Sequence, residues 1–140
     1  MPTNIHIEYK KTLSSAERIK SRKAIDILFT QGQKCSAFPY LIFYKMTRAA
    51  VPSILQFGIT VSKKKFKRAV DRNRVKRLSR EVYRQQKSIL QSALPPALHL
   101  ELFFVFVGTD IPEYTWLYKK MEAALLTIKA IVNENFDENT

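Results

Sequence analysis

The chain has 140 residues, of which 46% are hydrophobic and 26% are charged. These values are ordinary for a globular domain, so they exclude a disordered or collagen-like chain. The unusual property is the charge, because 24 lysines and arginines oppose 12 acidic residues and give a net charge of +12. Such an excess indicates a polyanionic partner such as nucleic acid, and less often an anionic membrane surface.

Neither a membrane segment nor a metal centre is indicated. The longest apolar runs, such as residues 103–107, are far shorter than the roughly 20 residues that cross a bilayer, and the N-terminus lacks the apolar core of a signal peptide. We therefore expect a soluble, cytoplasmic protein without a membrane partner. The single cysteine, Cys35, cannot form an internal disulfide, and His6 and His99 have no cysteine or histidine at metal-ligand spacing. Zinc and redox chemistry are not expected.

The chain is predicted to form one domain, residues 14–132, between flexible tails at residues 1–13 and 133–140. It has no internal repeat, no low-complexity tract and only three glycines. A linker to a second domain is therefore not expected.

The first helix is predicted at residues 22–31. Ser21 suits its N-cap and Gly32 its C′ stop. Its inner side is predicted to carry Ile25, Leu28 and Phe29, which recur at helical spacing.

Two strand-like runs follow, at residues 38–46 and 54–62, separated by a turn that contains Pro52. In the second run apolar and polar residues alternate, which is typical of a strand with one face in the core. The core-facing residues that this alternation predicts are Leu55, Phe57, Ile59 and Val61.

The next predicted helix is strongly basic and begins at Asp71, which suits an N-cap. At about 100° per residue, its apolar side chains share one side and its basic side chains share the other. The apolar side is predicted to carry Val75, Leu78, Ser79, Val82 and Tyr83. The opposite side is predicted to carry Asn73, Arg74, Lys76, Arg77, Arg80 and Arg84.

A strand and a helix complete the chain. Pro95 and Pro96 end the basic region, and residues 100–107 are nearly all apolar, as expected of a strand buried on both faces. A last helix is predicted from about Thr115. Its inner stripe is Leu117, Met121, Ala124, Leu125, Ile128 and Val132. The order helix, strands, helix, strand, helix indicates an α+β domain with helices packed on a sheet.

The positive charge is concentrated rather than dispersed. Residues 63–87 hold twelve lysines and arginines against two acidic residues, whereas the residues from 101 onward carry a net charge of −4. A merely solubilising surface would mix both signs. In the basic helix, like charges four residues apart, such as Lys76 and Arg80, repel each other, and too few acidic residues are near to compensate. We therefore interpret this side as a binding surface for phosphates, which an arginine contacts with two parallel hydrogen bonds.

The residue pattern favours binding over catalysis. A protein nuclease needs clustered carboxylates for metal ions, or a histidine as a base. In the basic segment, Asp71 and Glu81 would lie about 15 Å apart on one helix, too far to share a metal ion. We predict no catalytic and no metal-ligating residue in this chain.

The aromatic residues around the first helix and the first strand have two interpretations. Most are expected in the core. Alternation places Phe43 on one side of its strand and Tyr40 on the other, however, so some of these rings could line a groove instead. Unpaired bases stack on such rings with about 1 to 3 kcal/mol each.

Two segments together resemble the protein subunit of bacterial ribonuclease P. The first is the run FGITVSKK at residues 57–64, and the second is AVDRNRVKRLSRE at residues 69–81. The triplet Arg-Asn-Arg alone is a weak motif. A strand that ends in VSKK, a short basic loop and this basic helix are specific in combination. The similarity extends over about residues 18–128.

The resemblance implies a single domain with the element order α-β-β-β-α-β-α and a mixed sheet. The basic helix would lie in a left-handed β-α-β crossover, against the usual right-handed rule. The implied enzyme is a ribonucleoprotein that removes the 5′ leader from precursor tRNA. Its catalytic RNA subunit would supply the hydrolytic centre and hold most of the magnesium, while the protein raises substrate and magnesium affinity. The implied partners are this RNA and precursor tRNA, without a stable protein partner.

The resemblance also assigns two sets of residues. The RNA-binding set is Lys63, Lys64, Lys65, Arg68, Arg72, Asn73, Arg74, Lys76, Arg77, Arg80 and Arg84. Within it, Lys64 and Arg72 would lie near the path of the leader. The leader-cleft set, expected to contact the single-stranded leader, is Ile25, Phe29, Tyr40 and Phe43. The chain departs from the family pattern at Ile25, where a phenylalanine is usual, and in the loop at residues 63–68, where it has an extra residue and Lys67-Arg68 replaces Gly-Asn.

Three alternatives stay open. A structural or ribosome-associated RNA-binding protein without processing activity would have a similar composition. A small DNA-binding regulator is disfavoured, because residues 72–84 lack the preceding short helix and tight turn of a helix-turn-helix. A protein nuclease is disfavoured by the shortage of catalytic groups.

Overall fold

The structure, a computed structural model, describes residues 13–48 and 53–137 and is built on one four-stranded sheet. Its strands are β1 (Gln33–Ala37), β2 (Tyr40–Arg48), β3 (Ile54–Val61) and β4 (Leu98–Phe106). Their order in the sheet is β1-β2-β4-β3. The pairs β1–β2 and β2–β4 are antiparallel, whereas β3 and β4 are parallel. The sheet is therefore mixed, as expected.

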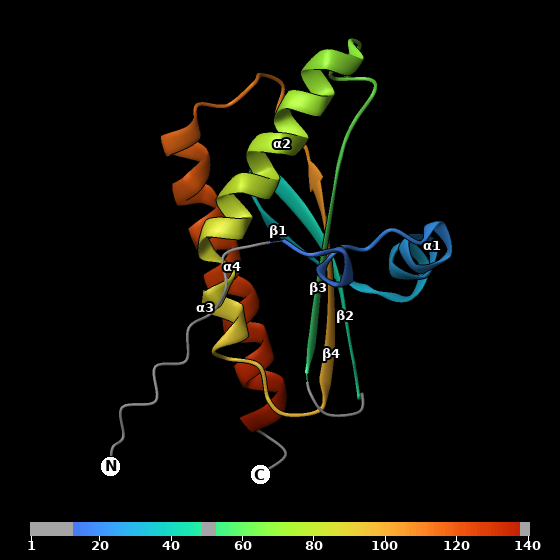
Figure 1. The fold of residues 1–140 in the computed structure, drawn as a ribbon, viewed down its shortest axis with the longest axis vertical. Helices are drawn as coiled ribbons and strands as arrows, with labels where there is room; N and C mark the ends of the chain where they lie inside the picture. Colours follow the sequence, from blue (N-terminus) through green and yellow to red (C-terminus); the bar gives the residue numbers. More distant parts are fainter. Residues whose placement is uncertain (1–12, 49–52, 138–140) are drawn as a thin grey trace.

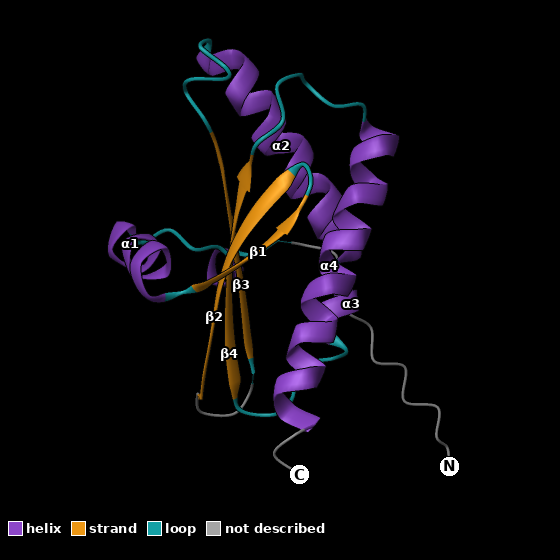
Figure 2. Ribbon diagram, turned by 180° about the vertical axis from the view of Figure 1, so that it is seen from behind, coloured by secondary structure: helices purple, strands orange, loops and turns teal. Residues whose placement is uncertain are grey.

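Helices pack on both faces of this sheet. They are η1 (Ser15–Glu17, a short 3-10 helix), α1 (Arg22–Gln31), α2 (Ala69–Gln86), α3 (Ser88–Gln91) and α4 (Tyr114–Asp137). Figures 1 and 2 show α2, α3 and α4 on one face and α1 on the other. This confirms the expected single α+β domain. The parallel unit β3-α2-β4 contains the basic helix, as expected, and the left hand of this crossover stays a prediction.

The main core lies between the sheet and the layer of α2 and α4. Alternation along β2 places Tyr40, Ile42 and Tyr44 in this core. The inner stripe predicted for α4 is confirmed, since all its members are fully buried: Leu117, Met121, Ala124, Leu125, Ile128 and Val132. The predicted inner side of α2 is buried as well, except that Leu78 is only partly covered.

Strand β4 lies between β2 and β3 and is covered on both faces, as predicted, although it begins two residues earlier than expected. Phe104 points into the main core. Its neighbour Phe103 points to the other face, where it packs with Ile19 and with Leu28 of α1 in a second, smaller cluster. The sheet thus has two cores, and the smaller one positions α1.

Helix α1 has the predicted bounds and the predicted N-cap, because Ser21 Oγ accepts a 3.2 Å hydrogen bond from the amide of Ala24. The helix ends before Gly32, as predicted, but Gly32 is its C-cap with a φ of −75°, so it does not adopt the left-handed conformation of a C′ glycine. A Cβ atom at this position would lie 2.5 Å from the carbonyl oxygen of Leu28 and 3.1 Å from that of Tyr44. Glycine is needed here because two backbone segments approach each other closely.

Replacing Gly32 by alanine should therefore destabilise the fold by about 1–3 kcal/mol, because the backbone must move to admit the methyl group. Urea unfolding monitored by circular dichroism measures this loss. The exposed neighbour Gln31 provides the control, since Gln31→Ala adds no contact and should change stability little. Equal stabilities of Gly32→Ala and Gln31→Ala would contradict the packing explanation.

The third early strand implied by the resemblance is β1, which directly follows α1. The predicted start of the next strand at Phe38 is wrong, because Phe38 and Pro39 form the turn between β1 and β2. Strand β1 lies at an edge of the sheet and three of its five residues are exposed, so it lacks the apolar alternation that reveals a strand. The turn predicted around Pro52 lies outside the described residues.

Two other boundaries differ from the prediction. Asp71 is not the N-cap of α2, since the helix begins two residues earlier and Arg68 occupies the cap position. Asp71 lies instead in the first turn, where a carboxylate is favourable beside the unpaired amide groups of the helix end. Helix α4 includes residues 133–137, which the sequence assigned to a tail. The predicted N-terminal tail lies outside the described residues, apart from Leu13, which packs against the core.

Candidate nucleic-acid interface

Helix α2 presents its basic side to solvent because its other side is anchored on the sheet. Tyr83 stacks on Phe57 of β3 with ring centroids 3.9 Å apart. Ser79 shares a 2.8 Å hydrogen bond with the hydroxyl of Tyr40 in β2. Burial raises the pKa of both tyrosines, so both hydroxyls stay neutral. The residues left exposed on the outer side are Asn73, Arg74, Arg77 and Arg80, with Lys76 partly exposed.

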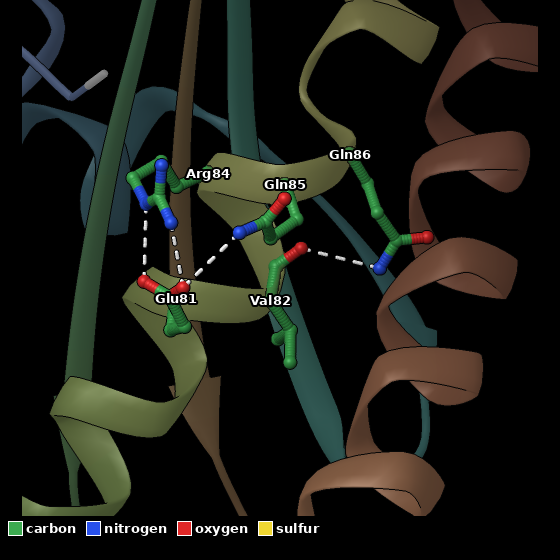
Figure 3. Close-up of polar contacts among 5 residues, drawn as sticks. All are labelled: Glu81, Val82, Arg84, Gln85 and Gln86. Atoms are coloured by element: carbon green, nitrogen blue, oxygen red, sulfur yellow. Dashed lines mark hydrogen bonds and ion pairs between the residues drawn. The ribbon is translucent and has the colours of Figure 1, made fainter. Parts of the chain in front are cut away.

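Few of the cations on α2 are neutralised by the chain's own carboxylates. In Figure 3, Arg84 contacts Glu81 through Nε at 3.0 Å and Nη2 at 2.6 Å, and Gln85 donates to the same carboxylate. This contact lowers the pKa of Glu81. Arg68 lies 3.9 Å from Asp71 in an exposed, weak pair. Among the described side chains of residues 13–48 and 53–135, no carboxylate forms an ion pair with the other cations of this helix, which are Arg72, Arg74, Lys76, Arg77 and Arg80. Arg84 is therefore the member of the predicted RNA-binding set whose charge is most closely compensated by a carboxylate.

Arg72 organises the basic loop that precedes α2. Its Nη1 donates hydrogen bonds to the carbonyls of Phe66 at 2.8 Å and Lys67 at 2.9 Å. Phe66 is buried in the main core and anchors the loop. Carbonyl groups do not neutralise a guanidinium, so Arg72 keeps its charge while it fixes the loop. The loop cations of the predicted set are all exposed, namely Lys63, Lys64, Lys65 and Arg68.

An aromatic cluster lies on the opposite face of the sheet, beside α1. Phe29 contacts Phe43 of β2 and Phe103 of β4 edge to face, with centroid distances of 4.7 and 5.5 Å. Phe29 is 42% exposed, so it can contact a ligand. The prediction that Tyr40 lies with these rings is wrong, because Tyr40 points to the other face of β2 and is fully buried. Phe103 was not predicted here, although its alternation with Leu102 along β4 could have indicated this side.

Ile25, the remaining residue of the predicted leader cleft, lines a cavity of about 350 Å³ at the edge strand β3. Arg80 of α2 reaches the same cavity around this edge, and Arg18 and Lys20 line it from the segment before α1. Burial, followed by the charges of Arg18 and Arg77, lowers the pKa of Arg80. The basic helix and the leader cleft, which the resemblance assigned as two sets of residues, thus meet at this cavity.

A buried ion pair joins the segment before α1 to the end of α2. The Lys87 ammonium, only 2% exposed, lies 2.5 Å from the carboxylate of Glu17. The other oxygen of this carboxylate accepts hydrogen bonds from the amide and hydroxyl of Ser14. Burial raises the pKa of Glu17, but the bonds from Lys87 and Ser14 outweigh it, and the net pKa is lowered. Sequence reasoning missed this pair because the two residues lie far apart in the chain.

Replacing Lys87 by methionine should cost about 2 kcal/mol of stability at neutral pH, because Glu17 loses its partner. A lowered pKa in the folded state stabilises the fold above the unfolded pKa of Glu17, about 4.3, and this stabilisation is lost as pH falls through the folded pKa. The difference in the free energy of unfolding between the wild type and Lys87→Met should therefore shrink below about pH 4. Urea unfolding from pH 7 to pH 3 measures it. A difference that stays constant over this range would contradict the assignment.

In the part of the chain that the structure describes, no three histidine, cysteine, aspartate or glutamate side chains lie together in a way that could hold a metal ion. None of the described helices is both long and apolar enough to cross a membrane.

This chain is similar to proteins of known sequence. A family model described as Ribonuclease P matches residues 13–129. The ribonuclease P protein component of Porphyromonas gingivalis is 35% identical over 120 residues, which cover 83% of this chain and 85% of that protein. The corresponding protein of Chlorobaculum tepidum is 41% identical over 85 residues, which cover 59% of this chain and 55% of that protein.

Solved structures share the fold. The RNase P protein of Staphylococcus aureus superimposes with a TM-score of 0.57 at 22% identity, covering 81% of this chain and 94% of the other. The RNase P protein of Thermotoga maritima gives a TM-score of 0.56 at 19% identity, covering 78% of this chain and 94% of the other. At these identities the likeness concerns the fold alone.

Proposed function

Because this chain belongs to the ribonuclease P protein family, we propose that it uses its continuous basic and aromatic surface to hold precursor tRNA against the catalytic RNA. As a ribonuclease P protein component, it is a subunit of an endoribonuclease that processes tRNA, and its partner is the RNA subunit. In the proposed arrangement, α2 and the loop before it contact the catalytic RNA. The groove beside α1 contacts the single-stranded 5′ leader.

The observation that carries this proposal is the row of cations on α2 that lack carboxylate partners among the described residues. Like charges on one helix face repel each other, and RNA phosphates would relieve this repulsion. Anchoring by Tyr83 and Ser79 fixes the direction of the helix, so the guanidinium groups need little reorganisation on binding.

The groove beside α1 supports leader binding for a different reason. The exposed ring of Phe29 offers a stacking surface that accepts any base, which suits a leader of variable sequence. Phe43 and Phe103 hold the ring of Phe29 in place by edge-to-face contacts. Ile25 supplies apolar contact but no ring, so stacking at its position is not part of the proposal.

Magnesium is the proposed cofactor, held mainly by the RNA subunit. When bound, it supplies charge stabilisation for hydrolysis of a phosphodiester. The described residues of this chain contain no cluster of carboxylates that would fit a magnesium site of their own. The lysines and arginines of the chain would instead screen the repulsion between the two RNAs. Fewer magnesium ions would then be needed for the RNAs to associate.

The test is a cleavage assay on precursor tRNA with the protein alone, the catalytic RNA alone and both together, at low and high magnesium. We expect no cleavage by the protein alone, and the largest gain from adding protein at low magnesium. Cleavage by the protein alone would contradict the proposal and indicate a protein nuclease. Binding of RNA without any gain in cleavage would indicate the alternative, a structural RNA-binding protein.

A further inference from the structure

The segment that carries Arg18 is held against the edge of the sheet by a backbone bridge, side-chain packing and polar contacts. Its backbone lies beside β3, at the edge of the sheet opposite to β4. There the amide of Ile19 donates a 3.0 Å hydrogen bond to the carbonyl of Phe57. The side chain of Gln56 donates a 3.2 Å bond to the carbonyl of Ala16. The side chain of Ile19 packs with Leu28 and Phe103 in the smaller core, and the ion pair between Glu17 and Lys87 joins the segment to the end of α2. Glu17 directly precedes Arg18 in the chain.

The same side of α2 meets this segment at two points. Lys87 follows Arg80 by seven residues, which is about two helical turns, so both point to the same side. Lys87 attracts Glu17. Arg80 faces the cavity that Arg18 also lines, so the two guanidinium groups share one cavity wall. Partial burial, and then the like charges of Arg18 and Arg77, lower the pKa of Arg80, so Arg18 repels it.

We propose that Glu17 and Lys87 are positioning residues, which hold Arg18 beside Arg80 so that the cavity wall is cationic before RNA arrives. The attraction between Glu17 and Lys87 offsets the repulsion between Arg18 and Arg80. Without the pair, Arg18 would move away from Arg80, and the groove beside α1 would lose part of its affinity for phosphates of the leader. This inference rests on the proposed leader binding.

The burial of the pair supports a positioning role over a merely solvated contact. Lys87 is almost fully buried, whereas both side chains of the pair between Arg84 and Glu81 on α2 are partly exposed to solvent. A buried pair is seldom the most stabilising choice for a site, since apolar residues of similar size often stabilise as well. An ion pair instead fixes the geometry between two elements. Here these elements are the segment before α1 and the end of α2.

The experiment compares holoenzymes that contain wild-type protein, Lys87→Met, and the exchanged pair Glu17→Lys with Lys87→Glu. The measured quantity is the affinity for precursor tRNA with a long leader relative to a short leader. A matched control is Val132→Ala, which destabilises the fold from the buried side of α4 without touching this segment. Hydrogen exchange of the Ile19 amide in the free protein reports directly on how firmly the segment is held.

We expect Lys87→Met to lower the leader-dependent gain in affinity about five- to tenfold, the loss expected for one weakened charge-assisted contact. It should also speed exchange at Ile19 and leave the affinity of the protein for the catalytic RNA unchanged. The exchanged pair should restore the gain, and Val132→Ala should leave it intact. A full leader-dependent gain in Lys87→Met, or an equal loss in Val132→Ala, would overturn the positioning role. A wild-type holoenzyme without any leader dependence would instead overturn the proposed function.

Discussion

Replacing Arg74, Arg77 and Arg80 together by glutamine should weaken binding of the protein to its catalytic RNA about a thousandfold at low salt. Each charge-assisted hydrogen bond to a phosphate contributes about 1.5 kcal/mol, and three of them correspond to about three powers of ten. The three arginines have no carboxylate partner among the described residues, so their removal leaves no unpaired acid. Fluorescence titration of the RNA with wild-type and variant protein measures the effect.

A control with the same change in net charge separates this site from general electrostatics. Lys34, Lys119 and Lys129 lie outside the predicted interface, and their joint replacement by glutamine removes three cations from other elements. When the two triple variants are compared at about 0.1 M salt, this control should lose far less affinity, because charges beyond about 10 Å are largely screened at that ionic strength. Equal losses in the two triple variants would show that only the net charge of the protein matters.

The largest effect on stability is expected for Phe104→Ala. Phe104 is fully buried in the main core, where its ring lies 5.1 Å from those of Tyr40 and Phe57. Truncating a buried phenylalanine costs about 3–5 kcal/mol, which is a large part of the total stability of a domain of this size. We expect the urea midpoint to fall markedly, and α2 to lose order with it, since Tyr83 of this helix stacks on Phe57.

The same substitution at an exposed ring provides the comparison. Phe38 is 62% exposed and has one ring contact, with Trp116 at 6.3 Å. Phe38→Ala should cost only about 1 kcal/mol, the contribution of an aromatic pair. Similar losses at Phe38 and Phe104 would mean that the assigned core does not carry the stability of the fold.

Most of the fold could be predicted from local patterns, because those patterns reflect burial. Helical spacing in α4 and alternation in β3 identified residues that the structure buries. The N-cap at Ser21 and the bounds of α1 followed from hydrogen-bonding rules that act within a few residues. Strand β1 was not predicted, because an edge strand with exposed residues lacks a burial pattern.

The candidate site also has a part that could be predicted from the sequence and a part that could not. Exposure of the arginines on α2 could be predicted, since it is the complement of an apolar stripe on one helix. Contacts between distant segments could not. The burial of Tyr40 depended on which face of β2 meets α2, and the pairing of Arg84 with Glu81 depended on the side-chain conformations. Only the three-dimensional structure brings Ile25 and Arg80 to one cavity.

In the proposed complex the cations of α2 contact RNA phosphates rather than carboxylates of the chain itself, and such contacts make RNA binding depend on salt. The affinity of the wild-type protein for its catalytic RNA should be measured between about 50 and 200 mM monovalent salt. If the helix and its loop neutralise about six phosphates, the affinity should fall roughly a thousandfold over this range. An affinity that changes by less than about fivefold, which corresponds to about one phosphate contact, would contradict the account.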